Sequence, residues 1–454
     1  MILSKNDKIE LTIDALTSEG SGIGRYDGFA VFVRGTVPGD RIIAHIIKAT
    51  KSYAIGIIDK ILSSSPSRIE SDCPYSKKCG GCSFRDMTYD EELKYKRARV
   101  QDAIQRIGGL DIEVEDIASA DSINHYRNKA QYPVCICDGE LFAGFYAYKS
   151  HRIIPCPDCL LQPVEFEQGI NAFAKWVEEA DVSSYDEKTG KGLLRHIYFR
   201  KGFKTGEVMA CAVINGNTLP RQELLVDLLR ENVDGLKSVV VNINKQDTNV
   251  VLSNESKCIW GSPYITDELL GRVFAISPNS FYQVNRTQCE KLYTIARELA
   301  DFKGDEVLLD LYCGVGTIGL TMADYVKDLI GIEIVPQAIE NAKENAKRNN
   351  IKNAHFICGD APKGAEILKK QGIKPDVIIL DPPRKGCDKS LFDTVEQMSP
   401  KRIVYVSCDS ATLARDLAVL EDKGYSTKRV VAVDLFPRTP HVESVALIER
   451  QSIE

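Results

Sequence analysis

Apolar strands alternate with amphipathic helices in the C-terminal part of the chain. From about residue 271, runs such as EVLLDLYC, DLIGIEIV, PDVIILD and RIVYVSC are separated by helical patterns such as PQAIENAKENAKRNN. Continuous apolar strands between helices are typical of a parallel sheet covered by helices on both faces. We therefore expect residues 271–454 to form a Rossmann-like α/β domain, which presents ligands at the carboxyl edge of its sheet.

A glycine-rich turn follows the first of these strands, in LLDLYCGVGTIGL. Gly314, Gly316 and Gly319 permit a tight turn and let a ligand approach the backbone. An acidic residue at the end of the next strand, Glu333 of GIEIV, can hold ribose hydroxyls. The glycine pattern alone also fits a dinucleotide.

A second motif, VIILDPPRKG, argues against a dinucleotide. Asp381-Pro382-Pro383 at a strand end resembles the motif of S-adenosylmethionine (SAM) methyltransferases that act on nucleobases. In those enzymes the rigid prolines shape a loop between cofactor and base. Together with the glycine turn, GIEIV and ICGDA, this motif predicts a SAM-dependent methyltransferase domain.

The N-terminal residues predict a small all-β barrel over 1–62. Short β-branched runs are separated by SEGSG, YDG and VPGD, and RIIAHIIKA nearly alternates. This region resembles a TRAM domain, an OB-like RNA-binding module of RNA-modifying enzymes, which implies RNA docking. A Ser/Pro-rich linker, LSSSPSR, then opens a mixed α+β central domain, expected over 63–270.

Three C-terminal motifs carry a more specific resemblance. DPPRKG, YVSCDSATLARD and PRTPHVESVALIER together resemble the RNA uracil-5-methyltransferase family and, with the cysteine cluster described below, its 23S rRNA branch. The resemblance implies that Cys408 is the nucleophile and Glu443 the general base. Carbon 5 of uracil is a poor nucleophile, so a thiolate must first add to carbon 6, and a base must later remove the proton from carbon 5.

The same resemblance implies a set of SAM contacts. These residues are Gln283, Tyr312, Gly314, Gly316, Thr317, Glu333, Asp360 and Asp381.

The chain departs from the family pattern beside the predicted nucleophile. It has SCDS where the family more often has Asn-Pro after the cysteine. Asp409 brings a negative charge near a thiol that must ionise. This charge raises the cost of the thiolate unless a basic residue compensates.

A cysteine cluster, CPYSKKCGGC, places Cys73, Cys79 and Cys82 at C-x5-C-x2-C spacing. HRIIPCPDCLLQ offers Cys156 and Cys159 as a fourth ligand. Four thiolates could hold either an iron–sulfur cluster or a structural zinc ion. The resemblance selects Cys159 and a 4Fe-4S cluster, with a folding and RNA-positioning role.

RNA contacts are expected in two basic segments, because the net charge of −6 leaves phosphate binding to local patches. HYRNKAQYPV and GLLRHIYFRKG match family segments, which indicates Arg127, Lys129 and Arg195 as RNA-binding residues. A target uracil in folded RNA must be extruded from its stack to reach a thiolate.

Charges interrupt the apolar residues of MILSKNDKIELTIDAL, and no segment reaches membrane-spanning length. We therefore expect a cytoplasmic protein with reduced cysteines and no membrane partner, and a monomer. The predicted activity is SAM-dependent methylation of carbon 5 of a uridine in 23S rRNA.

Three alternatives are weighed against this prediction. The first is a tRNA uracil-5-methyltransferase, although such relatives usually lack the barrel and the cluster. The second is a non-catalytic RNA-binding assembly factor, which the intact Cys408 and Glu443 disfavour. The third is a cytosine-5 methyltransferase, which would usually place a Pro-Cys pair after the DPP-type strand; DPPRKGCDKS has none.

Overall fold

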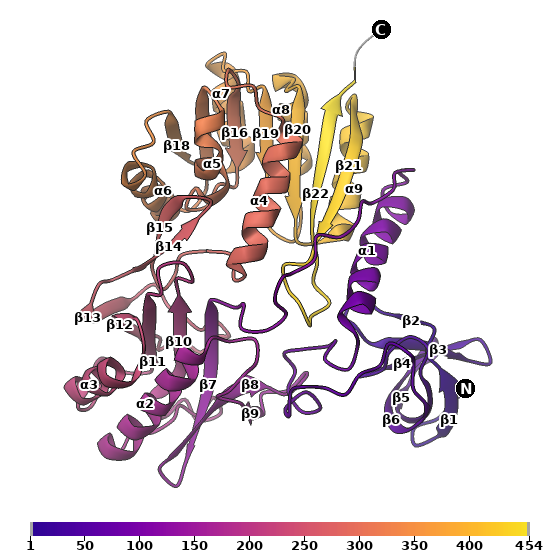
Figure 1. Ribbon diagram of the computed structural model, residues 1–454, viewed down its shortest axis with the longest axis vertical. Helices are drawn as coiled ribbons and strands as arrows, with labels where there is room; N and C mark the ends of the chain where they lie inside the picture. Colours follow the sequence, from indigo (N-terminus) through magenta and orange to yellow (C-terminus); the bar gives the residue numbers. More distant parts are fainter. Residues whose placement is uncertain (1–2, 452–454) are drawn as a thin grey trace.

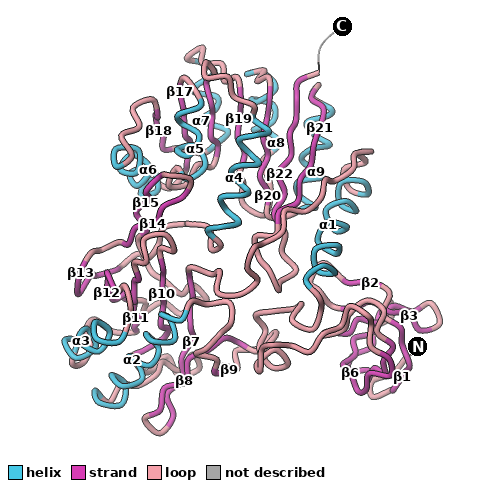
Figure 2. The backbone as a smooth tube through the Cα atoms, viewed as in Figure 1, coloured by secondary structure: helices cyan, strands magenta, loops and turns pink. Residues whose placement is uncertain are grey.

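The computed structural model describes residues 3–451, which form an N-terminal barrel, a central α+β part and a C-terminal α/β part (Figure 1). Long loops run between the three parts, as the tube in Figure 2 shows. No helix of the described chain is long and apolar enough to cross a membrane.

The N-terminal part is a six-stranded sheet in the order β1-β5-β6-β4-β3-β2. Ile9 and Leu11 point inward from the first strand and pack with Val31, Val33 and Ile42 in one apolar core. Alternate residues are therefore buried, which confirms the predicted barrel. Its strands are β1 (Lys8–Thr12), β2 (Ala15–Leu16), β3 (Gly22–Tyr26), β4 (Phe29–Val33), β5 (Arg41–Ala49) and β6 (Tyr53–Ser63).

The central part is a seven-stranded, mostly antiparallel sheet in the order β13-β12-β11-β10-β7-β8-β9. Two helices pack on it, α2 (Val164–Ala180) and α3 (Gln222–Asn232), and Phe173 and Trp176 of α2 are fully buried. The strands are β7 (Lys129–Cys137), β8 (Glu140–Tyr146), β9 (Ile153–Pro155), β10 (Leu194–Lys201), β11 (Val208–Ile214), β12 (Leu236–Ile243) and β13 (Ser256–Gly261).

The C-terminal sheet has the order β18-β17-β16-β19-β20-β22-β21. The first five strands are parallel, and β22 lies antiparallel between β20 and β21. Chain order reverses between β16 and β19, which is where such sheets bind ligands. The strands are β16 (Val307–Leu311), β17 (Asp328–Glu333), β18 (Ala354–Cys358), β19 (Val377–Leu380), β20 (Arg402–Ser407), β21 (Tyr425–Val433) and β22 (Glu443–Arg450).

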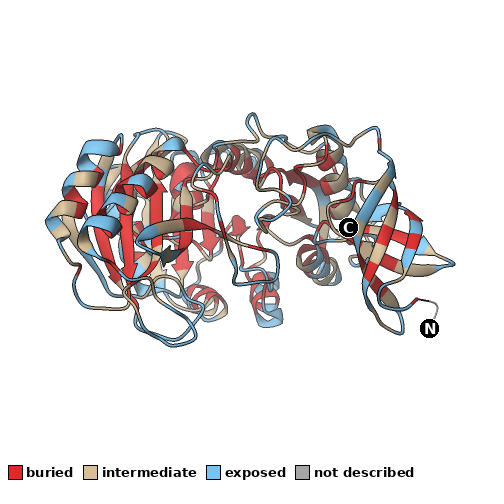
Figure 3. Ribbon diagram, turned by 90° about the horizontal axis from the view of Figure 1, so that it is seen from below, coloured by how far each residue is buried: buried red, intermediate tan, exposed pale blue. Residues whose placement is uncertain are grey.

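Helices cover both faces of this sheet, as predicted. Leu308 of β16 packs in one apolar core and its neighbour Leu309 packs in another, on the opposite face. Figure 3 shows buried strands flanked by helices with exposed outer surfaces. The helices are α4 (Arg286–Ala300), α5 (Thr317–Met322), the 3-10 helix η1 (Ala323–Tyr325), α6 (Pro336–Arg348), α7 (Ala361–Lys370), α8 (Lys389–Met398) and α9 (Ser410–Asp422).

Helix α1 (Tyr89–Arg106) lies within the region expected as the central domain, but it packs on the C-terminal domain. Val100 and Ile104 join the core formed with α9 and β21, and Ala118 bridges to Val433. Figure 1 shows α1 beside α9. The apolar stripe of α1 specifies that one face is buried, but not which domain buries it.

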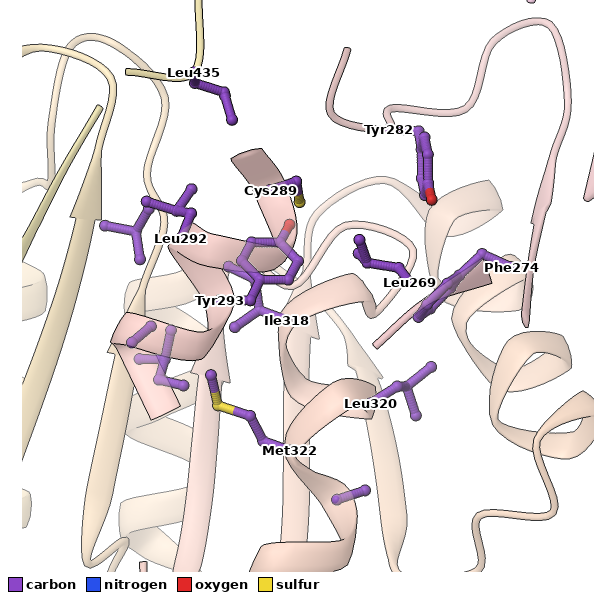
Figure 4. Close-up of a cluster of buried hydrophobic side chains, with 14 of the residues drawn as sticks. Leu269, Phe274, Tyr282, Cys289, Leu292, Tyr293, Ile318, Leu320, Met322 and Leu435 are labelled. Carbon is purple, nitrogen blue, oxygen red and sulfur yellow. The ribbon is translucent and has the colours of Figure 1, made fainter. Parts of the chain in front are cut away.

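A buried cluster packs α4 against α5, the helix that follows the glycine turn (Figure 4). Cys289, Leu292 and Tyr293 of α4 pack beside Ile318 and Met322 of α5. The hairpin of β14 (Ile265–Leu269) and β15 (Arg272–Ile276) contributes Leu269 and Phe274 to the same cluster. The helix that follows the glycine turn is therefore held in place by a packed apolar cluster.

Candidate active site

One cavity of about 680 Å³ opens at the carboxyl edge of the C-terminal sheet, where strand order reverses. It gathers the predicted reactive pair, Cys408 and Glu443, with the predicted RNA contacts Arg127 and Lys129. Seven of the eight predicted SAM contacts line it, namely Gln283, Tyr312, Gly314, Thr317, Glu333, Asp360 and Asp381. The eighth, Gly316, lies in the same turn.

The glycine turn has the backbone conformation that its residues predict. Gly314 and Gly316 have positive φ angles of 55° and 84°, and Tyr312 also adopts a positive φ, of 68°. The Gly314 amide donates to Glu333 Oε2 at 3.2 Å, and the Val335 amide donates to Oε1 at 2.9 Å. Backbone amides thus orient the acidic side chain at the end of β17.

Asp310, which was not assigned from sequence, stabilises the turn through a hydrogen bond. Its Oδ2 accepts from the Gly319 amide at 3.0 Å, and a Cβ at position 319 would lie 2.8 Å from that oxygen. Burial raises the pKa of Asp310 to about 8. A Cβ at 319 would therefore force the side chains of Asp310 and Leu329 to shift, which gives the third glycine of the motif a packing role without a ligand contact.

The register of the sheet brings the predicted nucleophile and base together. Strand β20 pairs antiparallel with β22, and Ser407 lies opposite Ser444. Cys408 directly follows Ser407, and Glu443 directly precedes Ser444, so both lie at the same end of this strand pair. Both residues line the cavity, and the charge of Glu443 acts on the Cys408 thiol.

Cys408 is partly buried, and three charged side chains act on its thiol. Burial, followed by the charge of Glu443, raises the pKa of Cys408 to about 11, and Asp381 adds to the rise. The charge of the Arg384 guanidinium opposes the rise. Arg384 is therefore the basic residue that favours the thiolate.

Arg384 was not assigned from sequence, although it lies in the DPPRKG motif. Its Nη2 lies 3.4 Å from His441 Nδ1. Burial and the nearby cations, Arg384 first, lower the pKa of His441 to about 4, so His441 is neutral at pH 7 and accepts from the guanidinium. The sequence could have indicated this role, because Arg384 is a cation only three positions after the predicted cofactor contact Asp381.

Glu443 is 3% exposed, and burial first, then the charge of Asp381, raises its pKa to about 8. Burial raises the pKa of Asp381 to about 7. A carboxylate whose pKa lies near neutral pH binds a proton far more readily than an ordinary glutamate. This property suits a general base.

Asp409 caps helix α9. Its Oδ1 accepts from the Ala411 and Thr412 amides at 3.0 Å each. The free amides and the dipole at the helix N-terminus compensate its charge. Burial, Glu443, Arg384 and Asp381 are the main causes of the shift in the Cys408 pKa, so the charge of Asp409 is not the chief obstacle to ionising this thiol.

The loop over 434–442, which leads into Glu443, is anchored by buried charges. Lys96 Nζ lies 2.7 Å from Glu92 Oε1 and 2.6 Å from Asp434 Oδ1, and all three residues are fully buried. The Arg438 amide donates to Glu92 Oε1 at 2.7 Å. Helix α1 therefore fixes the loop that delivers Glu443 and His441.

The predicted cluster cysteines line a second cavity, of about 310 Å³. Its thiols belong to Cys73, Cys79, Cys82, Cys159 and the fifth candidate, Cys156. Within residues 3–451, no group of three or more His, Cys, Asp or Glu side chains is placed to hold a single metal ion. The five thiols line one cavity, but they are not arranged around a common centre that a metal ion could occupy.

The surroundings of this cavity suit an anionic thiolate group. Arg85, Arg127 and Lys129 also line it, and the Gly81 amide donates to Cys79 Sγ at 3.3 Å. Cations and amide donors are the usual partners of metal-bound thiolates. These partners would suit a thiolate metal centre, but the thiols as placed form no metal site within the described residues.

Arg195 does not join either cavity. It is 7% exposed, its Nη1 donates to the carbonyls of Asn244 and Gln246 at 2.9 and 2.8 Å, and its guanidinium stacks on Tyr185. We predicted that Arg195 contacts RNA, but in the structure its guanidinium is engaged by backbone carbonyls and Tyr185 within the central domain.

Comparison with known proteins identifies the family. The pattern of the family described as "tRNA (Uracil-5-)-methyltransferase" matches residues 88–451, and that of the TRAM domain matches residues 4–58. An uncharacterized RNA methyltransferase of Clostridium tetani is 45% identical over 446 residues, 98% of this chain and 97% of the relative. One of Halalkalibacterium halodurans is 44% identical over 448 residues, 98% of each chain.

A solved structure matches across the three parts. It is the Pyrococcus abyssi tRNA (uracil-54, C5)-methyltransferase in complex with S-adenosyl-L-homocysteine, with a TM-score of 0.78 and 28% sequence identity. The match covers 97% of this chain and 99% of that one. The chain therefore belongs to the tRNA (Uracil-5-)-methyltransferase family and is a SAM-dependent RNA methyltransferase with an N-terminal TRAM domain.

Proposed function

We propose that this protein methylates carbon 5 of a uridine in 23S rRNA, with Cys408 as nucleophile and Glu443 as general base. The observation that supports the proposal is the pairing of β20 with β22, because Cys408 and Glu443 adjoin the same end of this pair and line one cavity beside the glycine turn.

The chemistry follows from the side chains. Arg384 favours the Cys408 thiolate, which adds to carbon 6 of the uracil and makes carbon 5 nucleophilic. SAM, when bound beside the glycine turn, supplies the methyl group that carbon 5 takes. Glu443 then removes the proton from carbon 5, the double bond between carbons 5 and 6 re-forms, and the thiolate leaves.

The cofactor site fits SAM by the chemistry of its donors. Glu333 is held by backbone amides at the end of β17, where a carboxylate can accept from ribose hydroxyls. Gly314 leaves open space in which a ligand can approach the backbone, since a Cβ there would have no neighbour within 4 Å. We assign the remaining predicted contacts, from Gln283 to Asp381, to the same cofactor.

We further propose that Cys73, Cys79, Cys82 and Cys159 hold a 4Fe-4S cluster. Its role is to link residues 73–82, which we call the cysteine loop, to the central sheet. Anaerobically purified protein should contain about four iron and four sulfide per chain. Protein that contains zinc and no iron would contradict the assignment.

A tRNA substrate is the second candidate, because the Pyrococcus abyssi tRNA enzyme matches over nearly the full length of both chains. The three-part architecture therefore does not separate the two substrates. Unmodified 23S rRNA and tRNA transcripts should each be incubated with isotopically labelled SAM, digested to nucleosides and examined by mass spectrometry. Labelled 5-methyluridine from 23S rRNA alone supports the proposal, and label in tRNA alone refutes it.

A further inference from the structure

A third cavity, of about 720 Å³, continues from Cys408 toward the barrel. It shares five lining residues with the active-site cavity, namely Arg127, Arg384, Cys408, Phe436 and His441. All three parts of the protein line it, and we call it the barrel groove. Its outer wall consists of Ser18, Glu19 and Arg34 from the barrel and Gly80, Tyr148 and Lys149 from the central part.

Positive charge dominates the barrel groove, although the chain as a whole is acidic. Its cationic lining residues are Arg34, Arg99, Arg127, Lys149 and Arg384. Its acidic residues are Glu19 and Asp409, and Asp409 is engaged as the cap of α9. A concave surface of this charge, inside a protein of net charge −6, attracts a polyanion.

The groove also holds an exposed aromatic ring that bridges two domains. Tyr148 follows β8 and is 42% exposed. The guanidinium carbon of Arg34, just after β4 of the barrel, lies 3.9 Å from its ring centroid. An exposed ring stacked with a guanidinium, in a cationic groove, is the kind of surface on which unpaired nucleobases stack.

The cysteine loop sets the position of this ring. The Gly80 amide donates to the Tyr146 carbonyl at 3.0 Å. A Cβ at position 80 would lie 2.9 Å from that carbonyl oxygen and 3.0 Å from the Tyr148 nitrogen. Glycine at 80 therefore allows the backbone around Tyr148 to lie directly against the cysteine loop.

We propose that the barrel groove binds the single-stranded RNA that flanks the target uridine, with one flanking base stacked on the Tyr148–Arg34 pair. This inference rests on the proposed function, because its ligand is a further part of the same substrate. Lys149, whose ammonium lies 5.2 Å from the Tyr148 ring centroid, and Arg127 also line the groove and are available for phosphate contacts. A flanking base must be unpaired to stack there, so the enzyme selects a uridine in a loop over one in a continuous helix.

The test measures binding of a short fluorescein-labelled oligouridine by fluorescence anisotropy. Tyr148→Ala should weaken the affinity roughly 5- to 100-fold, and Tyr148→Phe should retain it. Tyr325→Ala is a matched control. Its ring is 45% exposed and lies 4.7 Å from the Arg297 guanidinium carbon, but it does not line the groove.

Arg34→Gln is a second variant that keeps the test valid if Tyr148→Ala does not fold. It should weaken binding and reduce the salt dependence of the binding constant by about one charge. Equal affinity of the wild type, Tyr148→Ala and Arg34→Gln, or no binding by the wild type, would overturn the proposal.

The same proteins are assayed for methyl transfer to unmodified rRNA and tRNA. Methylation by the wild type without any effect of Tyr148 or Arg34 on binding would refute the groove and leave the proposed function intact. Binding that depends on Tyr148, without methylation of any RNA, would refute the proposed function and leave the groove intact.

Discussion

Removing Arg384 should make the Cys408 thiol harder to ionise. Two unit charges about 4 Å apart interact by about 4 kcal/mol near a protein surface and by about 1 kcal/mol in water. One pKa unit corresponds to about 1.4 kcal/mol. Arg384 is exposed, so solvent screening favours the lower value. We therefore expect Arg384→Met to raise the Cys408 pKa from about 11 by about one unit. The thiolate fraction below that pKa would fall about tenfold.

The assay is the rate of Cys408 alkylation by iodoacetamide across pH, followed on the Cys408 peptide by mass spectrometry. The rate at a given pH should fall about tenfold in Arg384→Met, and Lys385→Met is the matched control, because it removes the neighbouring cation that does not act on the thiol. Glu443→Gln should shift the profile the opposite way, to lower pH, because it removes a negative charge. Unchanged profiles in Arg384→Met and Glu443→Gln would refute this account of the thiol.

Three further predictions concern stability and the anchored loop. Asp409→Ala should lower the free energy of unfolding by about 0.5–2 kcal/mol through loss of the α9 cap, while Asp409→Asn, which keeps an acceptor, changes it little in thermal unfolding. The folded state raises the Glu443 pKa to about 8, so it binds a proton more tightly than the unfolded chain. Wild-type stability therefore falls as pH rises from about 4.5 to about 8, and the Tm advantage of Glu443→Gln should grow over that window; an advantage that shrinks would contradict the burial of a protonated Glu443. Lys96→Met leaves Glu92 and Asp434 buried without a cation, so it should destabilise the fold by about 3–5 kcal/mol. It should also slow proton removal more than adduct formation, so that a covalent RNA adduct accumulates; equal slowing of both steps would count against a positioning role.

Local sequence patterns predicted the parts of the site that lie on single strand ends. The glycine turn, Glu333 and Asp381 each follow an apolar strand, and parallel strands bring such ends to one edge. The residue types of Cys408 and Glu443 suggested their roles by resemblance. Their presence in one cavity depends on β22 lying between β20 and β21, a long-range arrangement that no local pattern specifies.

The sequence was less informative about charged side chains. Arg195 and Arg384 both lie in basic segments, yet Arg195 is buried against backbone carbonyls and Arg384 faces the thiol. The partners of a long cationic side chain depend on which carbonyls and anions the fold brings near it. The same limit applies to α1, whose apolar stripe did not reveal the C-terminal domain as its partner.

Covalent trapping tests the central claim most directly. The protein is incubated with SAM and a substrate RNA that carries 5-fluorouridine, whose fluorine cannot leave as a proton. We predict a stable adduct in which the RNA fragment is bonded to Cys408, located by mass spectrometry of the peptide and absent from Cys408→Ala. Formation of 5-methyluridine in normal RNA by Cys408→Ala, or an adduct on another residue, would contradict the account.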